Sequence, residues 1–180
     1  MREPLPSGRP QADEYASYAA ADIAEVAGDD IVSILRQQTL ETLSLFGDLG
    51  EERIRGLTYA PGKWTMKEIL GHLADDERIF TYRALTLARG DSAELPGFDE
   101  NAYVRLAEFE SRALADLLAE YRSVREGSVS LFSGLPQSAW LRRGMVNGYS
   151  ATVRGLAFHI AGHELHHHRV VRERYLVPTG

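Results

Sequence analysis

Apolar residues recur at intervals of three and four along most of this chain, and no long stretch alternates with a period of two. Four segments show this spacing, and together they cover most of the 180 residues. The period is typical of amphipathic helices, whereas half-buried strands alternate. Four helices of about 20–30 residues with modest connections favour an all-α fold, an antiparallel four-helix bundle.

Local signals predict where the first two helices begin and end. The first is expected to start at Asp29–Asp30, because acidic residues suit a helix N-terminus, and to stop in the Gly47–Gly50 stretch. The second opens with the capping-box pattern Thr65-Met66-Lys67-Glu68. Gly90 is expected to end it.

The two later helices have less distinct boundaries. The third is expected to begin near Asp99 and to continue as one helix to Phe132. The fourth follows Asn147-Gly148, with Ser150 as its expected N-cap. The connection between them, residues 133–149, is the longest and is expected to hold a short turn of helix.

The N-terminal stretch lacks the helical pattern. Met1–Pro10 contain three prolines and one glycine, which is typical of a flexible arm. Residues 12–27 are rich in alanine and fit either a short helix or an arm packed on the body. We therefore expect an N-terminal arm over residues 1–28 and one bundle domain over residues 29–176.

Composition excludes several classes of protein. Twenty Lys and Arg residues against 26 Asp and Glu give a net charge of −6, which argues against nucleic-acid binding. The absence of cysteine excludes disulfides, iron–sulfur clusters, thiolate zinc sites and a cysteine nucleophile. No apolar run reaches the ~18 residues of a membrane span, and residues 1–20 lack a signal-peptide core. A cytoplasmic protein that does not bind membranes is expected.

Five of the six histidines fall within residues 159–168. His163 and His167 lie on the apolar stripe of the fourth helix, and residues four apart have Cβ atoms about 5–6 Å apart, so both imidazoles can reach one metal ion. His72 likewise interrupts the apolar stripe of the second helix. A buried imidazole needs a hydrogen bond or a metal. Three inward-pointing histidines therefore predict one metal site with positions open for water or substrate.

Other interpretations of these histidines remain open. Taken alone, His72 fits a hydrogen-bonded core residue. A ligand pair formed by His159 and His163 is also geometrically possible. Ile160 lies closer to the centre of the apolar stripe than His159 does, which favours His163 and His167 as the ligand pair.

Several polar and aromatic residues near the expected site have ordinary explanations. His166 and His168 point away from the stripe and are expected at a solvated surface. Glu68 and Glu77 are likewise expected to be surface charges. Four aromatic residues could line a pocket mouth, although packing is the commoner role; they are Tyr15, Tyr18, Trp64 and Tyr149.

A zinc-protease pattern overlaps the histidine pair. Residues 163–167 read His-Glu-Leu-His-His and fit H-E-x-x-H, in which the glutamate, here Glu164, is the catalytic base. The downstream extension fails, because Val170 stands where glycine is needed and Glu173 where the third histidine is needed. A small bundle also offers no obvious peptide cleft, so a protease is the least favoured function.

Two carboxylates are candidates for acid–base chemistry at the site. Asp76 lies one turn after His72 on the same stripe, where it fits either a general base or a partner that orients a ligand histidine. Glu164 follows His163 and fits either a base or a residue that is solvated or paired with arginine.

Two stretches of the chain resemble the DinB-like, or YfiT-like, superfamily. They are Lys63-Trp64-Thr65 through Gly71-His72-Leu73-Ala74-Asp75-Asp76-Glu77, and His159 through Gly162-His163-Glu164-Leu165-His166-His167-His168. The similarity extends over roughly residues 29–176. It implies a four-helix bundle of the DinB-like type, commonly a homodimer, with a divalent metal held by three histidines.

Carried over residue by residue, the resemblance assigns His72, His163 and His167 as the metal ligands. It implies nickel or zinc as the metal, with manganese or iron as alternatives. Some relatives transfer a low-molecular-weight thiol such as bacillithiol, mycothiol or glutathione, and others are metal-dependent hydrolases. The surplus histidines His159, His166 and His168 depart from the pattern.

Three functions follow from these patterns. The first is a metal-dependent enzyme acting on a small molecule, by hydrolysis with metal-activated water or by transfer of a low-molecular-weight thiol. Since the chain has no cysteine, any thiol must come from a co-substrate. The second is a zinc metalloprotease, and the third is a non-catalytic metal-binding module that forms dimers.

Overall fold

The computed structural model describes residues 8–176, and the predicted all-α four-helix bundle is confirmed. Its four long helices are α2 (Ile31–Gly47), α4 (Met66–Ala88), α6 (Leu114–Gly134) and α7 (Val153–Val170). In α7 the last turn continues into a π-helical segment, Val171–Tyr175. Short elements join them: α1 (Ala20–Glu25), α3 (Glu51–Ile54) and α5 (Glu100–Ala107), with 3-10 turns at Ser17–Ala19, Phe109–Ser111 and Gln137–Ala139.

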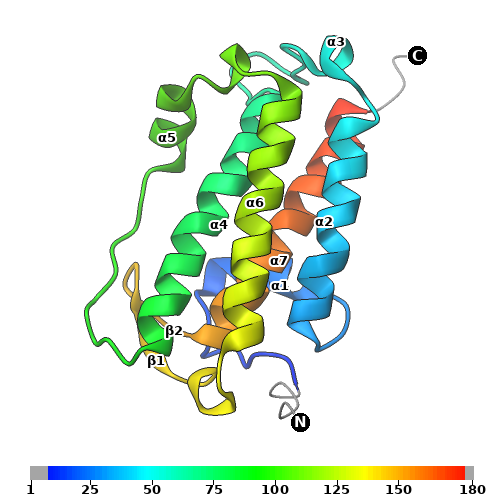
Figure 1. Cartoon of the computed structure of the whole chain (residues 1–180). Coiled ribbons are helices and arrows are strands. Elements are labelled where there is room, and N and C mark those ends of the chain that lie inside the picture. Colours follow the sequence, from blue (N-terminus) through cyan, green and yellow to red (C-terminus); the bar gives the residue numbers. More distant parts are fainter. Residues whose placement is uncertain (1–7, 177–180) are drawn as a thin grey trace.

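The helices do not alternate strictly along the chain. Helices α2 and α7 run one way along the bundle, and α4 and α6 run the other way (Figure 1). Both α2 and α4 pack against α6 and against α7, so consecutive helices α2 and α4 lie across the bundle from each other. The connection from α4 to α6 therefore runs back along the length of the bundle and carries α5 (Figure 1). This order makes α4 and α7 direct neighbours, which is the contact that the histidines require.

Side-chain caps fix the helix starts much as the sequence predicts. Asp30 accepts a hydrogen bond from the Ser33 amide, and Thr65 and Glu68 form the predicted capping box at α4. Beyond α4, Gly90 adopts φ +79°, a conformation that residues with a Cβ rarely adopt. The expected turn of helix in the 133–149 connection is present at Gln137–Ala139.

Two boundary predictions were wrong. The third segment is two helices rather than one, because Glu108 takes a left-handed conformation (φ 51°) that ends α5 before α6 begins. Ser150 is not the N-cap of the fourth helix but lies in a strand. Thr152 caps α7 instead, accepting a hydrogen bond from the Gly155 amide.

That strand belongs to a short antiparallel hairpin, β1 (Arg143–Val146) and β2 (Tyr149–Thr152), with Val146 paired to Tyr149. Asn147 and Gly148 both have positive φ and form its two-residue turn. Burial does not alternate strictly along either strand, so neither leaves a clear period-two signal in the sequence.

The N-terminal segment packs along α7. The 3-10 turn and α1 lie against this helix, and the Arg9 guanidinium donates to the Ile23 carbonyl at 2.6 Å. A Cβ at Gly162 would come within 2.6 Å of the Asp22 backbone, so glycine allows this close approach. The expectation of a flexible arm over Met1–Pro10 falls mostly on residues outside the described part of the chain.

The bundle interior consists of two apolar clusters with a polar layer between them. One cluster lies at the hairpin end and includes Phe80 and Leu156; the other lies toward α3 and includes Phe46 and Leu70. Most buried polar residues of the long helices fall between members of the two clusters, whereas Lys67, His72 and Arg83 of α4 fall among members of a single cluster. The buried polar residues between the clusters are Gln38 and Thr42 in α2, Asp76 and Glu77 in α4, Arg125 and Ser128 in α6, and Glu164 and His168 in α7. The candidate site therefore lies at mid-height of the bundle.

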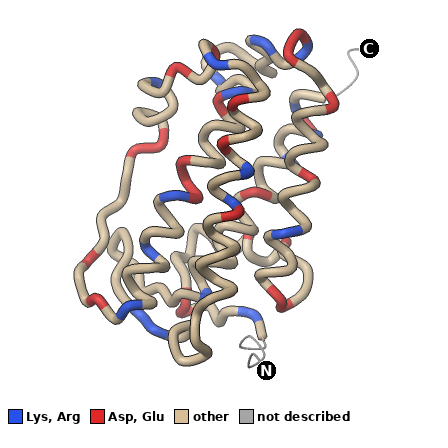
Figure 2. Tube along the Cα trace, in the orientation of Figure 1, with Lys and Arg blue, Asp and Glu red and all other residues tan. Residues whose placement is uncertain are grey.

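Charged residues of both signs are interspersed along the helices in Figure 2. Within residues 8–176, no helix is both long enough and apolar enough to cross a membrane.

Candidate metal centre

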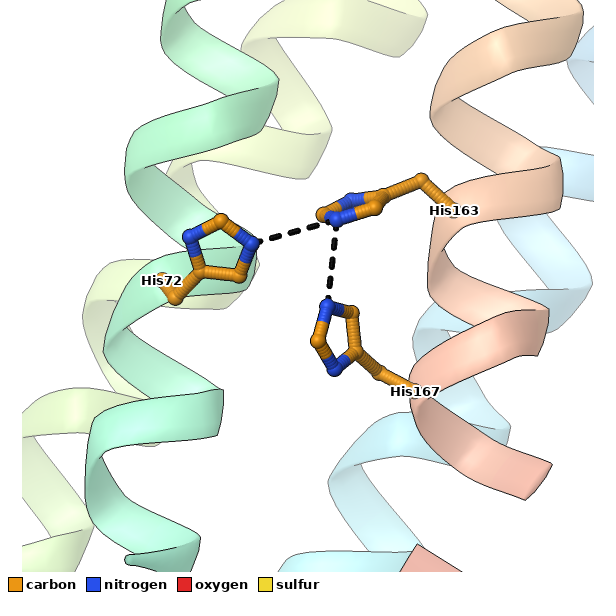
Figure 3. Close-up of side chains that lie close together, drawn as sticks. All are labelled: His72, His163 and His167. Carbon is orange, nitrogen blue, oxygen red and sulfur yellow. Dashed lines mark hydrogen bonds between the residues drawn. The ribbon is translucent and has the colours of Figure 1, made fainter. Parts of the chain in front are cut away.

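Helices α4 and α7 bring three histidines together, as the sequence analysis expected. The Nε2 atom of His163 lies 3.1 Å from Nε2 of His72 and 3.1 Å from Nε2 of His167. The ligand atoms of all three lie within 4.8 Å of one another. Figure 3 shows the rings converging from two helices on one point. We call these residues the histidine triad.

The spacing of the triad fits a single small divalent ion. Two nitrogens bound to one ion at 2.0–2.1 Å lie about 2.9 Å apart at a right angle and about 3.4 Å apart at the tetrahedral angle. The separation of 3.1 Å between His163 and each partner falls between these values. Within residues 8–176, the triad is the only group of three His, Asp or Glu residues whose ligand atoms all lie within 4.8 Å of one another.

Burial keeps the triad in the form that binds metal. It lowers the pKa of His72 to about 4. Burial also lowers the pKa values of His163 and His167 well below the ordinary value, and repulsion between the rings adds to the effect. Three neutral imidazoles at pH 7 offer free lone pairs, which metal binding requires.

Asp76 lies beside the central histidine of the triad. The Oδ2 atom of Asp76 lies 3.2 Å from Nδ1 of His163. The other ring nitrogen of His163, Nε2, faces His72 and His167. Burial raises the pKa of Asp76 to about 8, against the opposing charge of Arg83. The positive charge of a metal ion held by the triad would lower this pKa and favour the ionised carboxylate. A carboxylate that accepts from the second ring nitrogen fixes the tautomer and orientation of a ligand histidine. Of the two roles considered for Asp76, the geometry favours this orienting one.

Aromatic rings hold the triad from the side. The Trp64 ring lies 4.7 Å from the His72 ring and stacks at 6.2 Å on that of His167, between centroids. Gly71, the residue before His72 in α4, lies against Phe109, and a Cβ at that position would come within 2.3 Å of the phenyl ring. These contacts fix the position of His72 on the bundle axis.

The triad opens into a pocket of about 420 Å³, which we call the triad pocket. Tyr18 and Trp64 line it, as one interpretation of the aromatic residues expected, whereas Tyr15 and Tyr149 line a smaller hollow beside it. A second hollow of about 300 Å³ shares Trp64, His166 and His167 with the triad pocket. The site is therefore open to a small molecule.

The surplus histidines take different positions. The His159 ring stacks on Phe80 with centroids 4.0 Å apart and lines the triad pocket, but it is not part of the triad. His166 is half-exposed and lies 3.1 Å from Asp22. The expectation that His168 lies at a solvated surface was wrong, since the residue is 0% exposed.

His168 belongs to a buried polar network in the interior of the bundle. At its centre, the Arg125 guanidinium binds Glu77 at 2.8 and 3.0 Å and Glu164 at 2.6 Å. The hydroxyls of Thr42 and Tyr121 donate to Glu164, and Thr42 also lies 2.6 Å from Nε2 of His168. We call these six residues the Arg125 network. It joins all four long helices.

The Arg125 network contains two glutamates that the sequence analysis discussed, Glu77 and Glu164. Glu77, expected at the surface, is 2% exposed and pairs with Arg125. Glu164 does not line the triad pocket, and both of its carboxylate oxygens are bound within the network. The interpretation of Glu164 as a residue paired with arginine fits this geometry, and the pair lies in the protein interior. The geometry leaves Asp76 as the carboxylate in contact with the triad.

Two buried arginines, Arg83 and Arg125, were missed in the sequence. Arg125 lies four residues after Tyr121 and seven residues before Phe132. This helical spacing puts Arg125 on the same helix face as the two aromatic residues, which faces the interior. Arg83 follows Phe80 by three residues on the stripe of His72, and it lines the triad pocket. A charged residue on an apolar stripe was the available signal in both cases.

Comparisons with known proteins agree with this architecture. A family model described as the DinB superfamily matches residues 34–171. The structure is similar to that of YfiT from Bacillus subtilis, described as a probable metal-dependent hydrolase with an unusual four-helix bundle topology. That match has a TM-score of 0.69 at 16% sequence identity, and it covers 92% of this chain and 93% of that chain. No curated protein matches the sequence.

Proposed function

Because this chain belongs to the DinB superfamily and brings three neutral imidazoles to the wall of one pocket, we propose that it is a metal-dependent hydrolase of a small molecule. The observation that carries the proposal is the convergence of the three Nε2 atoms, two of them 3.1 Å from the third. A histidine set of three without a fourth protein ligand is the catalytic arrangement rather than the structural one.

Each residue at the site has a distinct part in this proposal. His72, His163 and His167 would hold one divalent metal, with nickel or zinc as the first candidates. When bound there, such an ion lowers the pKa of a water molecule toward neutrality and polarises a carbonyl or similar group. Asp76 holds the His163 ring through Nδ1, so that its Nε2 lone pair points at the shared centre.

The size of the triad pocket supports a small substrate. A volume of about 420 Å³ lies within the usual range for small-molecule sites, about 300–1,000 Å³. Glu164, the base of the protease pattern, faces the Arg125 network instead of this pocket. The geometry therefore gives no support to protease action.

Transfer of a small thiol is the second candidate, and the adjoining hollow of about 300 Å³ favours it. This hollow meets the triad pocket at Trp64 and His167, so two small molecules could lie side by side at the triad. The nucleophile would be the co-substrate's thiol, since the chain has no cysteine.

A panel of small esters, amides and lactams tests the proposal. Each compound is offered to the metal-free protein and to protein reloaded with zinc, nickel or manganese, with and without glutathione. We expect turnover that needs metal and the triad but no thiol, and that His72→Ala abolishes. Turnover that appears only with glutathione would favour the second candidate, and equal turnover by metal-free protein would refute both.

A further inference from the structure

Arg83 is a buried cation without an anionic partner, and it faces the triad pocket. Its side chain lines this pocket, and the residue is only 3% exposed. Its one hydrogen bond within the described part of the chain runs from Nη2 to the Pro96 carbonyl, at 2.7 Å. No carboxylate of residues 8–176 lies within 4.0 Å of the guanidinium. Buried guanidinium groups ordinarily have such a partner, because an unpaired buried charge is costly.

Two of the three acidic residues that line the pocket contact histidines, and the third is exposed. Asp76 contacts His163, and Asp22 contacts His166 at 3.1 Å. Glu100 is exposed near the start of α5. Asp76 acts on Arg83 only through space. The guanidinium thus keeps N–H groups free for a ligand that enters the pocket.

Packing fixes the guanidinium in a defined place. Its central carbon lies 4.6 Å from the centre of the Phe80 ring and 5.8 Å from that of Phe98. Together with the bond to Pro96, these contacts hold the planar group between α4 and the connection that follows it. A rigid, planar donor pair suits a carboxylate, which it can bind through two parallel hydrogen bonds.

The distance between Arg83 and the triad sets the shape of the ligand. His72 and Arg83 are eleven positions apart in α4, which is a rise of about 16–17 Å between their Cα atoms. Long side chains on a helix lean toward its N-terminus, so the Arg83 guanidinium leans back toward Asp76 and the triad. One small molecule can therefore reach both groups if its anionic end and its reacting bond are several bonds apart.

We propose that Arg83 is the carboxylate-binding residue of the triad pocket, and that the substrate is a small monocarboxylate whose reacting group lies at the triad. This proposal rests on the proposed function only where it states that the reacting group lies at the triad. A monoanion is favoured over a phosphate dianion, because Arg83 is the sole Lys or Arg lining this pocket in the described part of the chain.

The test measures binding of three carboxylates, acetate, benzoate and 3-phenylpropionate, and of their neutral amides. Wild type, Arg83→Met and Arg142→Met are titrated by calorimetry, each with and without bound metal. Arg142 is the control, since its guanidinium, like that of Arg83, binds one backbone carbonyl, that of Ala88, but Arg142 does not line the pocket. Thermal unfolding of each variant confirms that it is folded.

We expect at least one acid to bind more tightly than its amide, and Arg83→Met to weaken that acid about tenfold or more while leaving its amide unchanged. Arg142→Met should bind like wild type. Equal weakening in both variants, affinity unaffected by Arg83→Met, or no acid preferred over its amide up to 10 mM would each overturn the proposal.

The metal-free titration separates this proposal from the proposed function. If the protein binds no metal and its carboxylate binding still requires Arg83, the subsite would be supported and the metal enzyme refuted. Carboxylate binding that requires metal but not Arg83 would refute the subsite and leave the metal enzyme intact.

Discussion

Replacing Glu164 by glutamine is expected to destabilise the fold without emptying the triad. The wild-type carboxylate accepts from Arg125 at 2.6 Å and from the hydroxyls of Thr42 and Tyr121, and it is 1% exposed. Glutamine removes the charge, so Arg125 keeps only Glu77 as an anionic partner. Truncating one partner of a buried pair costs about 3–5 kcal/mol. Because Glu77 remains, we expect about 3 kcal/mol, or about 6–12 °C in melting temperature.

The pH dependence of this loss follows from the pKa of Glu164. Burial would raise that pKa, but Arg125, His168 and the hydrogen bonds from Thr42 and Tyr121 lower it below its ordinary value of 4.5. A lowered folded-state pKa gives stability that is present above the unfolded-state pKa and lost as pH falls through the folded one. The difference between wild type and Glu164→Gln should therefore be largest near neutral pH and shrink below about pH 4.

Urea unfolding at pH 7 and at pH 3.5, with metal content measured on the same samples, checks this prediction. Glu126→Gln is the matched control, because Glu126 is exposed on α6 beside Arg125. It should change neither stability nor metal content. Unaltered stability of Glu164→Gln together with lost turnover would refute the structural role and revive Glu164 as a base.

Three further predictions concern the triad and its supports. Asp76→Asn should weaken metal affinity about 10–100-fold, because His163 loses the carboxylate that orients it; competition with a chromophoric chelator measures this, and unchanged affinity contradicts the orienting role. Gly162→Ala should cost about 1–3 kcal/mol, since its Cβ would meet the Asp22 carbonyl at 2.7 Å. Hydrogen exchange over residues 17–25 should then quicken, and unchanged exchange argues against this packing. Metal-free protein should be less stable by about 4 kcal/mol than protein in free metal at a thousand times its Kd. Its helical circular dichroism should be retained. Calorimetry with and without chelator measures the stability difference, and circular dichroism of the same samples measures the helix content.

Helix content and the triad were accessible from the sequence because both leave periodic signals. Imidazoles at His163 and His167 keep the spacing of an apolar stripe, and His72 does the same on the second helix. The capping box at Thr65–Glu68 also depends on local geometry alone and was predicted correctly.

Features that depend on tertiary contacts were not accessible. His168 and Glu77 look like surface residues by spacing, and they are buried only because Thr42 and Arg125 approach them from other helices. The break at Glu108 depends on one left-handed residue with no glycine to signal it. The diagonal placement of consecutive helices depends on long connections, whose course no local pattern encodes.

Metal content by mass spectrometry, on protein purified without a histidine tag, tests the central claim most directly. Wild type is compared with His72→Ala and with the His163→Ala/His167→Ala double variant. We expect one divalent ion per chain in wild type and none in either variant, because ligands from two helices share one centre. No metal in wild type after reconstitution with nickel, zinc and manganese, or metal retained in both variants, would contradict the account.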